Sequence, residues 1–359
     1  MTKNAQKPAS AWSRNSQLIV PLLSILLLVV FNLIRDPSFF SVEITTNNLG
    51  NTVLSGNLIS IFNGASELAI LAMGMTLVTA AAGGQDISVG ALAAIAGSVF
   101  VRVLRSGAAI TPLTIVLAFV ACCIVAILFG AFNGTLVAVF KIQPMIATLV
   151  LYTCGRSVAY WINGGASPTV SSPLLTAIGS FIPGIPVPTP ILIVALCGII
   201  FALVFRFTTL GLYTQSVGIN QRAARLNGIN STGIKLLSFM ILGVCCAVAG
   251  AIAVCRLGLI NHETVLLEIE MDAILAVAIG GNALGGGKFK MAGSVLGAYA
   301  IQALTTTLYA MKVPSTAIKS YKAVVIILIV VIGSPMVKQA ASRLLARFRA
   351  SGAKGKEAA

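Results

Sequence analysis

The sequence predicts an all-α polytopic membrane protein, and three observations support this fold class. Hydrophobic residues make up 57% of the chain and charged residues only 9%, which is too apolar for a water-soluble surface. The apolar residues gather in solid runs of about 20, the length that crosses the hydrocarbon of a bilayer. A β-barrel would show short alternating segments instead, so we expect helices, which satisfy their own backbone groups in lipid.

Hydropathy and helix breakers together predict about ten transmembrane helices, the eighth of which is short. The segment 17–337 is therefore expected to be the transmembrane domain. Residues 1–16 form a tail before it, and residues 338–359 form a basic tail after it. The ten predicted spans cover residues 17–34, 60–82, 88–104, 112–140, 145–163, 190–207, 232–256, 271–283, 291–311 and 319–337.

The distribution of Lys and Arg predicts that both termini are cytoplasmic. Of the 24 cationic residues, sixteen fall on the same side as the N-terminus in this arrangement. The reverse orientation would violate the positive-inside rule. The basic start precedes an apolar run that is too long for the core of a signal peptide, so residues 1–16 are expected to remain as a cytoplasmic tail.

Two connections between the predicted spans are long. Residues 164–189, on the outside, hold five prolines, which argue against a regular helix or a central strand. The cytoplasmic connection 208–235 contains a short predicted helix, with Asn220 as its N-cap, residues 221–227 as its body and Gly228 as a left-handed stop.

Two helical turns are unstable alone in water, so this short helix must pack on its own protein or on a partner. Arg222 and Arg225, if exposed, would suit a groove with an acidic rim. A solvated connector is the alternative, since most loops are simply exposed to water.

The stretch Gly83-Gly84-Gln85-Asp86 interrupts an apolar sequence, and two interpretations are open. In the first, the glycines end the second span, Asp86 or Ser88 caps the third, and the break is a cytoplasmic turn. In the second, the break lies at membrane depth beside a water-filled path, and Gln85, Asp86 and Ser88 hydrogen-bond a polyhydroxyl solute. An Asp facing lipid would cost about 2.5–3.5 kcal/mol, so Asp86 faces protein or water in both cases.

A second glycine-rich stretch, residues 280–290, is expected to be a similar helix break. It does not match a nucleotide-binding phosphate loop, because Asn282 stands where the motif needs Gly and Phe289 stands where it needs Ser or Thr. The serine-hydrolase G-x-S-x-G motif and the zinc H-E-x-x-H motif are also missing, so no enzyme activity is expected.

The composition also argues against a metal, a cofactor or a nucleic-acid partner. The seven cysteines lie in or beside apolar spans without metal-ligand spacing, and they are expected to be small core residues. The carboxylates of residues 268–272 offer too few oxygens for a hard cation. The net charge of +15 is spread between the spans, and aromatic residues are scarce, so no nucleic-acid platform is implied.

Four stretches, in order along the chain, resemble the permease subunits of ribose-type sugar ABC importers, in the branched-chain amino acid/ribose permease family. The resemblance covers roughly residues 64–337, and the last two stretches are most similar to galactofuranose-transporting members. The four are LAMGMTLVTAAAGGQDISVGALAAIAG (71–97), FNGTLVAVFKIQPMIATL (132–149), VGINQRAARLNGI (217–229) and EMDAILAVAIGGNALGGG (270–287).

This resemblance implies the type II ABC importer permease fold in the bacterial cytoplasmic (inner) membrane. Two permeases, identical or homologous, would form the translocation path. A separate ATP-binding cassette ATPase would drive it from the cytoplasm, and an extracytoplasmic sugar-binding protein would deliver the sugar. The implied mechanism is alternating access, in which ATPase closure moves the short helix of 220–228 and rocks the spans.

The resemblance also assigns residues. The ATPase-coupling positions are Gly218, Asn220, Ala223, Ala224, Arg225 and Gly228, with Arg222 in the same short helix. The positions near the translocation path are Gly83, Gly84, Asp86, Ser88, Gly90 and Asn133, to which we add Gln85, Asn282 and the helix-break glycines Gly280 and Gly281.

Two residues depart from the family pattern. Gln85 and Glu67 stand where the family is normally apolar, so they either tune the substrate or, for Glu67, meet lipid headgroups. The rival hypothesis is a proton-coupled secondary sugar transporter in which Glu67 or Asp86 carries the proton. A receptor or structural membrane protein is a third hypothesis, but it gives no reason for the polar helix breaks.

Overall fold

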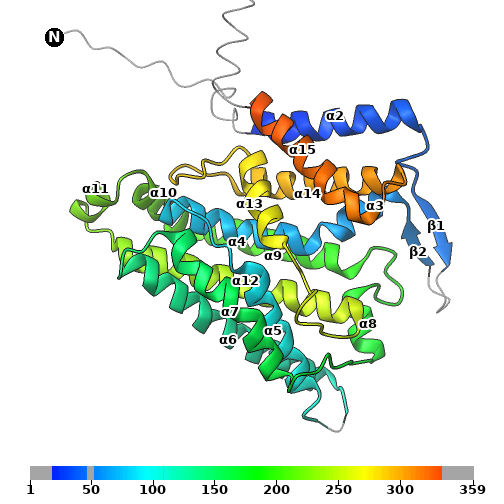
Figure 1. Ribbon diagram of the computed structural model, residues 1–359, viewed down its shortest axis with the longest axis horizontal. Helices are drawn as coiled ribbons and strands as arrows, with labels where there is room; N and C mark the ends of the chain where they lie inside the picture. Colours follow the sequence, from blue (N-terminus) through cyan, green and yellow to red (C-terminus); the bar gives the residue numbers. More distant parts are fainter. Residues whose placement is uncertain (1–17, 47–51, 108, 334–359) are drawn as a thin grey trace, which may run out of the picture. The chain divides into compact units, whose positions relative to one another are not determined.

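The computed structural model describes residues 18–46, 52–107 and 109–333 (Figure 1). The described residues form fourteen helices and one two-stranded hairpin, which confirms the predicted all-α class. The elements are α2 (Ile19–Arg35), β1 (Glu43–Thr46), β2 (Thr52–Ser55), α3 (Asn57–Gly64), α4 (Ser66–Ala82), α5 (Val89–Leu104), α6 (Pro112–Ala138), α7 (Pro144–Ile162), α8 (Pro173–Gly179), α9 (Thr189–Phe207), α10 (Leu210–Ile219), α11 (Gln221–Leu226), α12 (Ser231–Leu257), α13 (Ile269–Ile279), α14 (Met291–Ala310) and α15 (Ser315–Gly333).

Each predicted span coincides with a helix, although the first and last windows extend beyond the described residues. Among the described helices, α6, α7, α9 and α12 are long and apolar enough to cross a membrane alone. The predicted second span is broken at Ala65, where α3 and α4 meet with a 41° bend, and this pair makes a fifth candidate. The short eighth span is the eleven-residue helix α13. The full count of ten spans stays a prediction.

The chain divides into two compact units, residues 1–306 and residues 307–359. Helix α14 begins in the first unit and ends in the second, and α15 belongs to the second. All contacts described below lie within the first unit.

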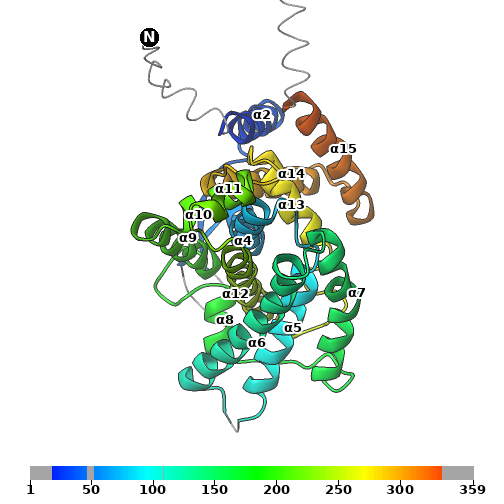
Figure 2. The same ribbon diagram turned by 90° about the vertical axis from the view of Figure 1, so that its left-hand side faces the viewer.

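Helices α12 and α4 form the core of the first unit. In α12, 72% of the membrane-spanning window is buried, against 17% in α9, because α12 packs on α4, α5 and α6 (Figure 2). Helix α4 is buried from Ser66 to Ala81, as expected for a helix that is apolar on all sides. At Gly130, an added Cβ would lie 2.6 Å from the Phe239 carbonyl oxygen, so this small residue allows α6 to approach α12 closely.

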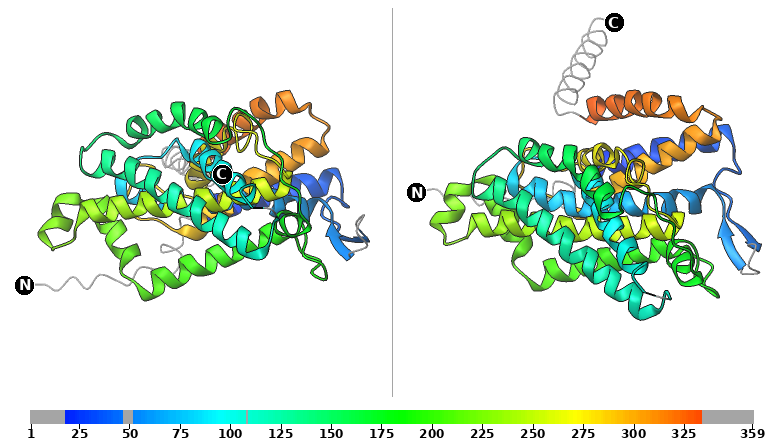
Figure 3. Two further views of the ribbon diagram at one scale, coloured as in Figure 1. Left: turned by 90° about the horizontal axis from the view of Figure 1, so that it is seen from below. Right: turned by 60° about the horizontal axis from the view of Figure 1, so that its bottom comes forward.

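The first unit has two distinct ends, because α4, α9 and α12 run lengthwise between them (Figures 1 and 3). The α11 end holds the two glycine-rich breaks and the connection 208–230. The hairpin end holds β1, β2 and α8, and there Leu54 N donates to Pro186 O and Val170 N donates to Gly258 O. The loops predicted to share one side of the membrane thus share one end of the unit.

Three details differ from the sequence predictions. The proline-rich connection 164–189 is not wholly irregular, because α8 forms inside it with Pro173 in the first turn, where a missing N–H costs no helical bond. The connection 208–235 holds α10 as well as the short helix. Cys154 is exposed rather than a core residue, Cys123 and Cys197 are half-buried, and only Cys122, Cys245, Cys246 and Cys255 are buried.

Candidate functional site

The first glycine-rich break begins where α4 ends. Gly83 is left-handed, with φ of 68° and ψ of 33°, and its N–H donates to the Thr79 carbonyl, which confirms the predicted cap. The predicted cap of α5 is right in position and different in chemistry. Ser88 occupies the N-cap position, but it makes no side-chain capping bond, and its N–H and Oγ instead donate to Asp86 Oδ1 at 2.7 and 2.6 Å. Because Asp86 forms this local turn with Ser88, neither side chain accepts a bond from the amides of α5.

Asp86, Ser88 and Asn133 form a buried polar cluster, and no more than 1% of any of the three is exposed. Asn133 Nδ2 on α6 donates to Ser88 Oγ at 2.9 Å and more weakly to Asp86 Oδ2 at 3.4 Å. The structure therefore brings together three residues that the sequence analysis placed near the path, and it satisfies them mostly with one another.

The segment between Gly84 and Ser88 runs along α7. Gly84 lies against the Pro144 ring at the start of α7, and Ile87 N donates to Thr148 Oγ1 at 3.1 Å. Thr148 is four residues further along, so this segment advances about 6 Å beside α7 before α5 begins. Helix α5 thus starts about one helical turn beyond the start of α7, and the position of this break at membrane depth stays a prediction. Its second residue, Gly90, packs on Glu270 of α13.

The second break, residues 280–290, is closed by Asn282. Asn282 Oδ1 accepts from Lys290 N at 2.7 Å, and Asn282 Nδ2 donates to Ser294 Oγ at 2.8 Å. Thr76 Oγ1 on α4 donates to the same Ser294 oxygen at 2.6 Å. Gly281 is left-handed, with φ of 76°, and Gly280 lies against the backbone of Gly293. Asn282 is therefore a buried brace that ties the loop to Ser294 of α14, which in turn contacts α4 through Thr76.

The two breaks contact each other and the last turn of α10. Gly287 N donates to Ala80 O at 3.0 Å, and Gln85 Nε2 donates to Leu284 O at 2.9 Å. Gly218 packs directly on both Ala80 O and Gly287 N, with no room for a Cβ. We call residues 80–85 and 284–287, together with Gly218, the glycine junction.

Helix α11 follows this junction immediately. Asn220, two residues after Gly218, accepts from the N–H groups of Arg222 and Ala223 at 3.0 Å each, which confirms it as the N-cap. The helix ends at Leu226, one residue earlier than predicted, and Gly228 is left-handed with φ of 78°. A displacement of α11 would therefore reach the glycine junction through only two linking residues, Ile219 and Asn220.

Helix α11 is braced on the start of α12. Arg225 Nε donates to Ser231 Oγ at 2.6 Å, and Gln221 Nε2 donates to the same oxygen at 3.2 Å, while Ala224 is buried beneath them. Arg225 is nonetheless exposed, as its proposed partner contact requires, and only its Nε is engaged by Ser231.

The surface that α11 exposes carries Arg222, Ala223, Arg225 and Leu226. Leu226 is 89% exposed, although it is a large apolar residue. The sequence analysis missed Leu226 and Ser231. The sequence did carry a signal for Leu226: it is a large apolar residue just before Gly228, the predicted end of the helix, in a largely polar connection.

At the hairpin end, charged side chains connect α3, α4 and α12. Glu67 Oε2 on α4 lies 3.3 Å from Arg256 Nη2 at the end of α12, and Arg256 also donates to Asn63 O at 2.9 Å, across the bend between α3 and α4. We call these three residues the Glu67 link. Only 5% of Glu67 is exposed, so it is a buried ion-pair partner rather than a headgroup contact.

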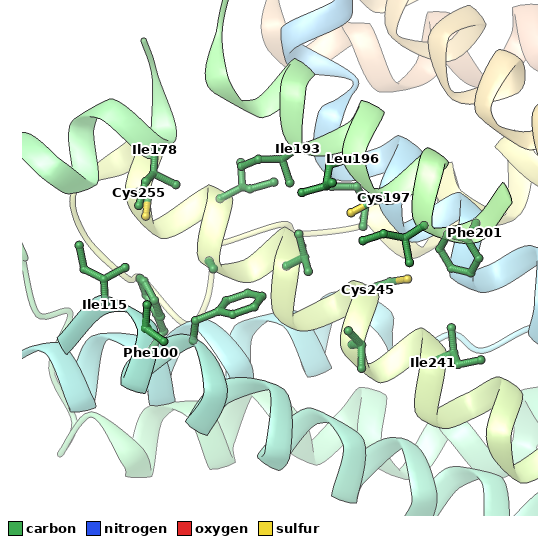
Figure 4. A pocket seen from close by; sticks show the side chains of 18 of the residues that line it. Phe100, Ile115, Ile178, Ile193, Leu196, Cys197, Phe201, Ile241, Cys245 and Cys255 are labelled. Atoms are coloured by element: carbon green, nitrogen blue, oxygen red, sulfur yellow. The ribbon is translucent and has the colours of Figure 1, made fainter. Parts of the chain in front are cut away.

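A cavity of about 650 Å³ lies between α6, α9 and α12 (Figure 4). Phe100 and Ile115 line one side of it, and Ile193, Leu196 and Phe201 line the other. Its whole lining consists of apolar side chains and cysteines, so this cavity suits an acyl chain and offers nothing to a polar solute.

Residues 57–333 match the family model described as "Branched-chain amino acid transport system / permease component". The chain belongs to this permease family. The match spans both glycine-rich breaks, α11 and the Glu67 link of the permease, and it confirms the resemblance that the four sequence stretches indicated.

The permease is similar over most of its length to curated sugar permeases. It is 38% identical to the galactofuranose transporter permease of Escherichia coli, over 87% of this chain and 88% of the relative. It is 33% identical to the fructose import permease of Bifidobacterium longum, over 90% and 89%, and 34% identical to the ribose import permease of Escherichia coli, over 90% and 94%. No solved structure gives a significant match to this permease.

Proposed function

We propose that this chain is the membrane-spanning permease subunit of an ATP-binding cassette importer for a monosaccharide. The observation that carries the proposal is the similarity over about nine-tenths of the chain to permeases named for galactofuranose, fructose and ribose. The partners in this proposal are a second permease, a separate ATPase and an extracytoplasmic sugar-binding protein in a bacterial inner membrane.

In this proposal the ATPase docks on α11 at its exposed surface of Arg222, Ala223, Arg225 and Leu226. The support is geometric: α11 is too short to persist without packing, and it is braced on Ser231 on one side only. Arg225, Ala224 and Asn220 keep α11 folded and attached, and Gly218 passes its movement to the glycine junction.

The α11 end faces the cytoplasm in this proposal, together with both termini, and the hairpin end faces the binding protein. Lys141, Arg222, Lys235, Lys288 and Lys290 belong to connections or helix ends on the α11 side, which supports this orientation through the positive-inside rule.

The candidate path residues Gln85, Asp86, Ser88, Asn133 and Asn282 are all buried in the subunit. We propose that they serve the path by holding the two helix breaks in shape, because irregular backbone within a membrane protein needs such internal partners. Direct contact between these side chains and a solute stays a prediction.

Uptake of ribose, fructose and galactofuranose in cells that produce the complete importer tests the proposal. We expect Ala224→Trp, which forces bulk under α11, and Arg225→Ala, which removes its brace, to abolish uptake while the permease still inserts in the membrane. We also expect Leu226→Asp to lower uptake, because a charged residue at this exposed apolar position should weaken ATPase binding to α11. Unchanged uptake in all three variants would remove the coupling role of α11.

The rival, proton-coupled mechanism predicts the opposite energy dependence. We expect uptake to continue when a protonophore dissipates the proton gradient at constant ATP. Loss of uptake under this condition would favour Glu67 or Asp86 as a proton carrier.

A further inference from the structure

Helix α7 packs on the rest of the first unit through one stripe only. Its buried residues recur at helical spacing on a single side, and they pack mainly on α5. Figure 2 shows α7 at the margin of the unit, beyond α5. The buried residues are Pro144, Ala147, Thr148, Leu151, Gly155 and Ala159. The remaining circumference of α7 is open.

The open side of α7 carries a line of hydroxyl groups. Thr153, Ser157 and Tyr160 are all exposed, and their i, i+4, i+7 spacing places them in one row, opposite the buried stripe. Thr153 Oγ1 donates to Val150 O at 2.9 Å, which satisfies its proton and leaves its lone pairs free to accept. We call these three residues the hydroxyl stripe.

The other spans show what a lipid-facing surface looks like in this protein. In α6, every exposed residue from Leu113 to Phe132 is apolar, and in α9 the same holds from Leu192 to Leu203. The apolar cavity of Figure 4 opens between these two helices. Helix α7 has the lowest mean hydropathy of the four single-helix spans. Its open side mixes the three hydroxyls with exposed apolar residues such as Ile146 and Leu149, whereas the exposed residues of α6 and α9 over these ranges are all apolar.

The surroundings of the hydroxyl stripe are fixed by hydrogen bonds. Arg156, beside the stripe, donates to the carbonyls of His262, Glu263 and Val265 at 2.7, 3.1 and 3.2 Å. The ring of Tyr160 lies against that of His262, with centroids 4.9 Å apart. The guanidinium is therefore engaged by backbone oxygens, and the groups that the row itself presents are neutral hydroxyls.

We propose that the hydroxyl stripe of α7 faces a water-filled translocation path and hydrogen-bonds a neutral polyhydroxyl solute in transit. The inference rests on the proposed function, because it assigns the sugar path of that importer to one helix face. Polar side chains within membrane spans face a protein interior or water, and hydroxyls at three levels offer successive weak contacts, as a transit site requires. A row of neutral hydroxyls suits a sugar better than an ionised substrate.

Thiol labelling from outside intact cells tests this proposal, because a charged reagent reaches only thiols in contact with water. The probe is 2-sulfonatoethyl methanethiosulfonate, applied to the native exposed Cys154 and, in a Cys154→Ser background, to Thr153→Cys and Ser157→Cys. Val120→Cys on α6 and Ile199→Cys on α9 are matched controls on the lipid-facing side. We expect the α7 thiols to react at least ~10-fold faster than the controls, since the thiolate forms only in water.

A solute effect then distinguishes a sugar path from a general aqueous surface. We expect ribose, fructose or galactofuranose, whichever the cells import, to slow labelling at residues 153 and 157. We also expect Ser157→Trp to block uptake, whereas Val120→Trp leaves it unchanged. Labelling of all three α7 thiols no faster than the controls, or labelling that the imported sugar does not slow, overturns the proposal. Fast labelling in cells that show no ATP-driven uptake of any of the three sugars would instead count against sugar import, and it would leave the water-facing stripe standing.

Discussion

The glycine junction and the Glu67 link hold the two ends of α4 by opposite physical means. At the junction, Gly218 meets Ala80 and Gly287 backbone to backbone, with no side chain between them. At the hairpin end, Glu67 and Arg256 reach each other with long side chains across 3.3 Å. A close-packed backbone contact cannot yield without moving both partners, whereas a long ion pair can rearrange. We infer that the α11 end transmits displacement rigidly and that the hairpin end can open and re-form.

The largest effect should come from placing a side chain in the glycine junction. In Gly218→Val, the new Cβ meets the backbone atoms of Ala80 and Gly287, which cannot move aside as a flexible side chain would. We expect sugar uptake to fall at least ~10-fold, because the displaced α10 no longer moves the breaks with α11. Transport assays with quantification of membrane-inserted protein measure this.

Gly198→Val in α9 is the matched control, because an added Cβ there meets no atom within 4 Å. It should insert and transport like the native permease. Equal activity in the two valine variants would show that the glycine junction transmits nothing.

An intermediate effect is expected for Asn133→Leu. The change removes the amide donor from Asp86 and Ser88 while both stay buried, which should cost about 1–3 kcal/mol of stability. A lower melting temperature of the purified permease would measure the loss. The neighbouring Phe132→Leu, on the exposed side of α6, should leave the melting temperature nearly unchanged. A stable Asn133→Leu variant would mean that the polar cluster does not hold the first break.

The smallest effect should come from the Glu67 link. Arg256→Leu leaves the Glu67 carboxylate buried without its cation, and we expect a loss of about 1 kcal/mol, less than for a fully buried pair because Arg256 is partly exposed. The double variant Glu67→Leu/Arg256→Leu should be more stable than Arg256→Leu alone, since no charge is then stranded. Thermal melting of both proteins tests this. Equal stability of the two would show that Glu67 and Arg256 do not stabilise each other.

Much of the fold was predictable because the bilayer dictates it. A solid apolar run must become a helix in lipid, and so helices lie at all ten windows. Asn220 and Gly228 were predictable because capping depends on local sequence. Helix α8, helix α10 and the bend at Ala65 were not, since they depend on packing rather than on hydropathy.

The sites were harder to predict because they combine distant parts of the chain. No local pattern links Gly218 to Ala80 and Gly287, and their contact follows only from the way α4, α10 and the second break pack. Asp86 resembled a helix cap in the sequence, but it forms a local turn with Ser88 and pairs with Asn133 on α6. The hydroxyl stripe could be recognised only in the structure, because its exposed hydroxyls stand out only against the apolar exposed sides of α6 and α9.

Reconstitution of the purified permease in sealed vesicles tests the central claim most directly. With the proposed ATPase and binding protein present, ATP should drive accumulation of sugar above the external concentration. The permease alone should accumulate nothing with ATP, with a proton gradient or with both. Uphill accumulation by the lone permease would contradict the account, because it would mean that the energy enters through this chain rather than through a motor docked on α11.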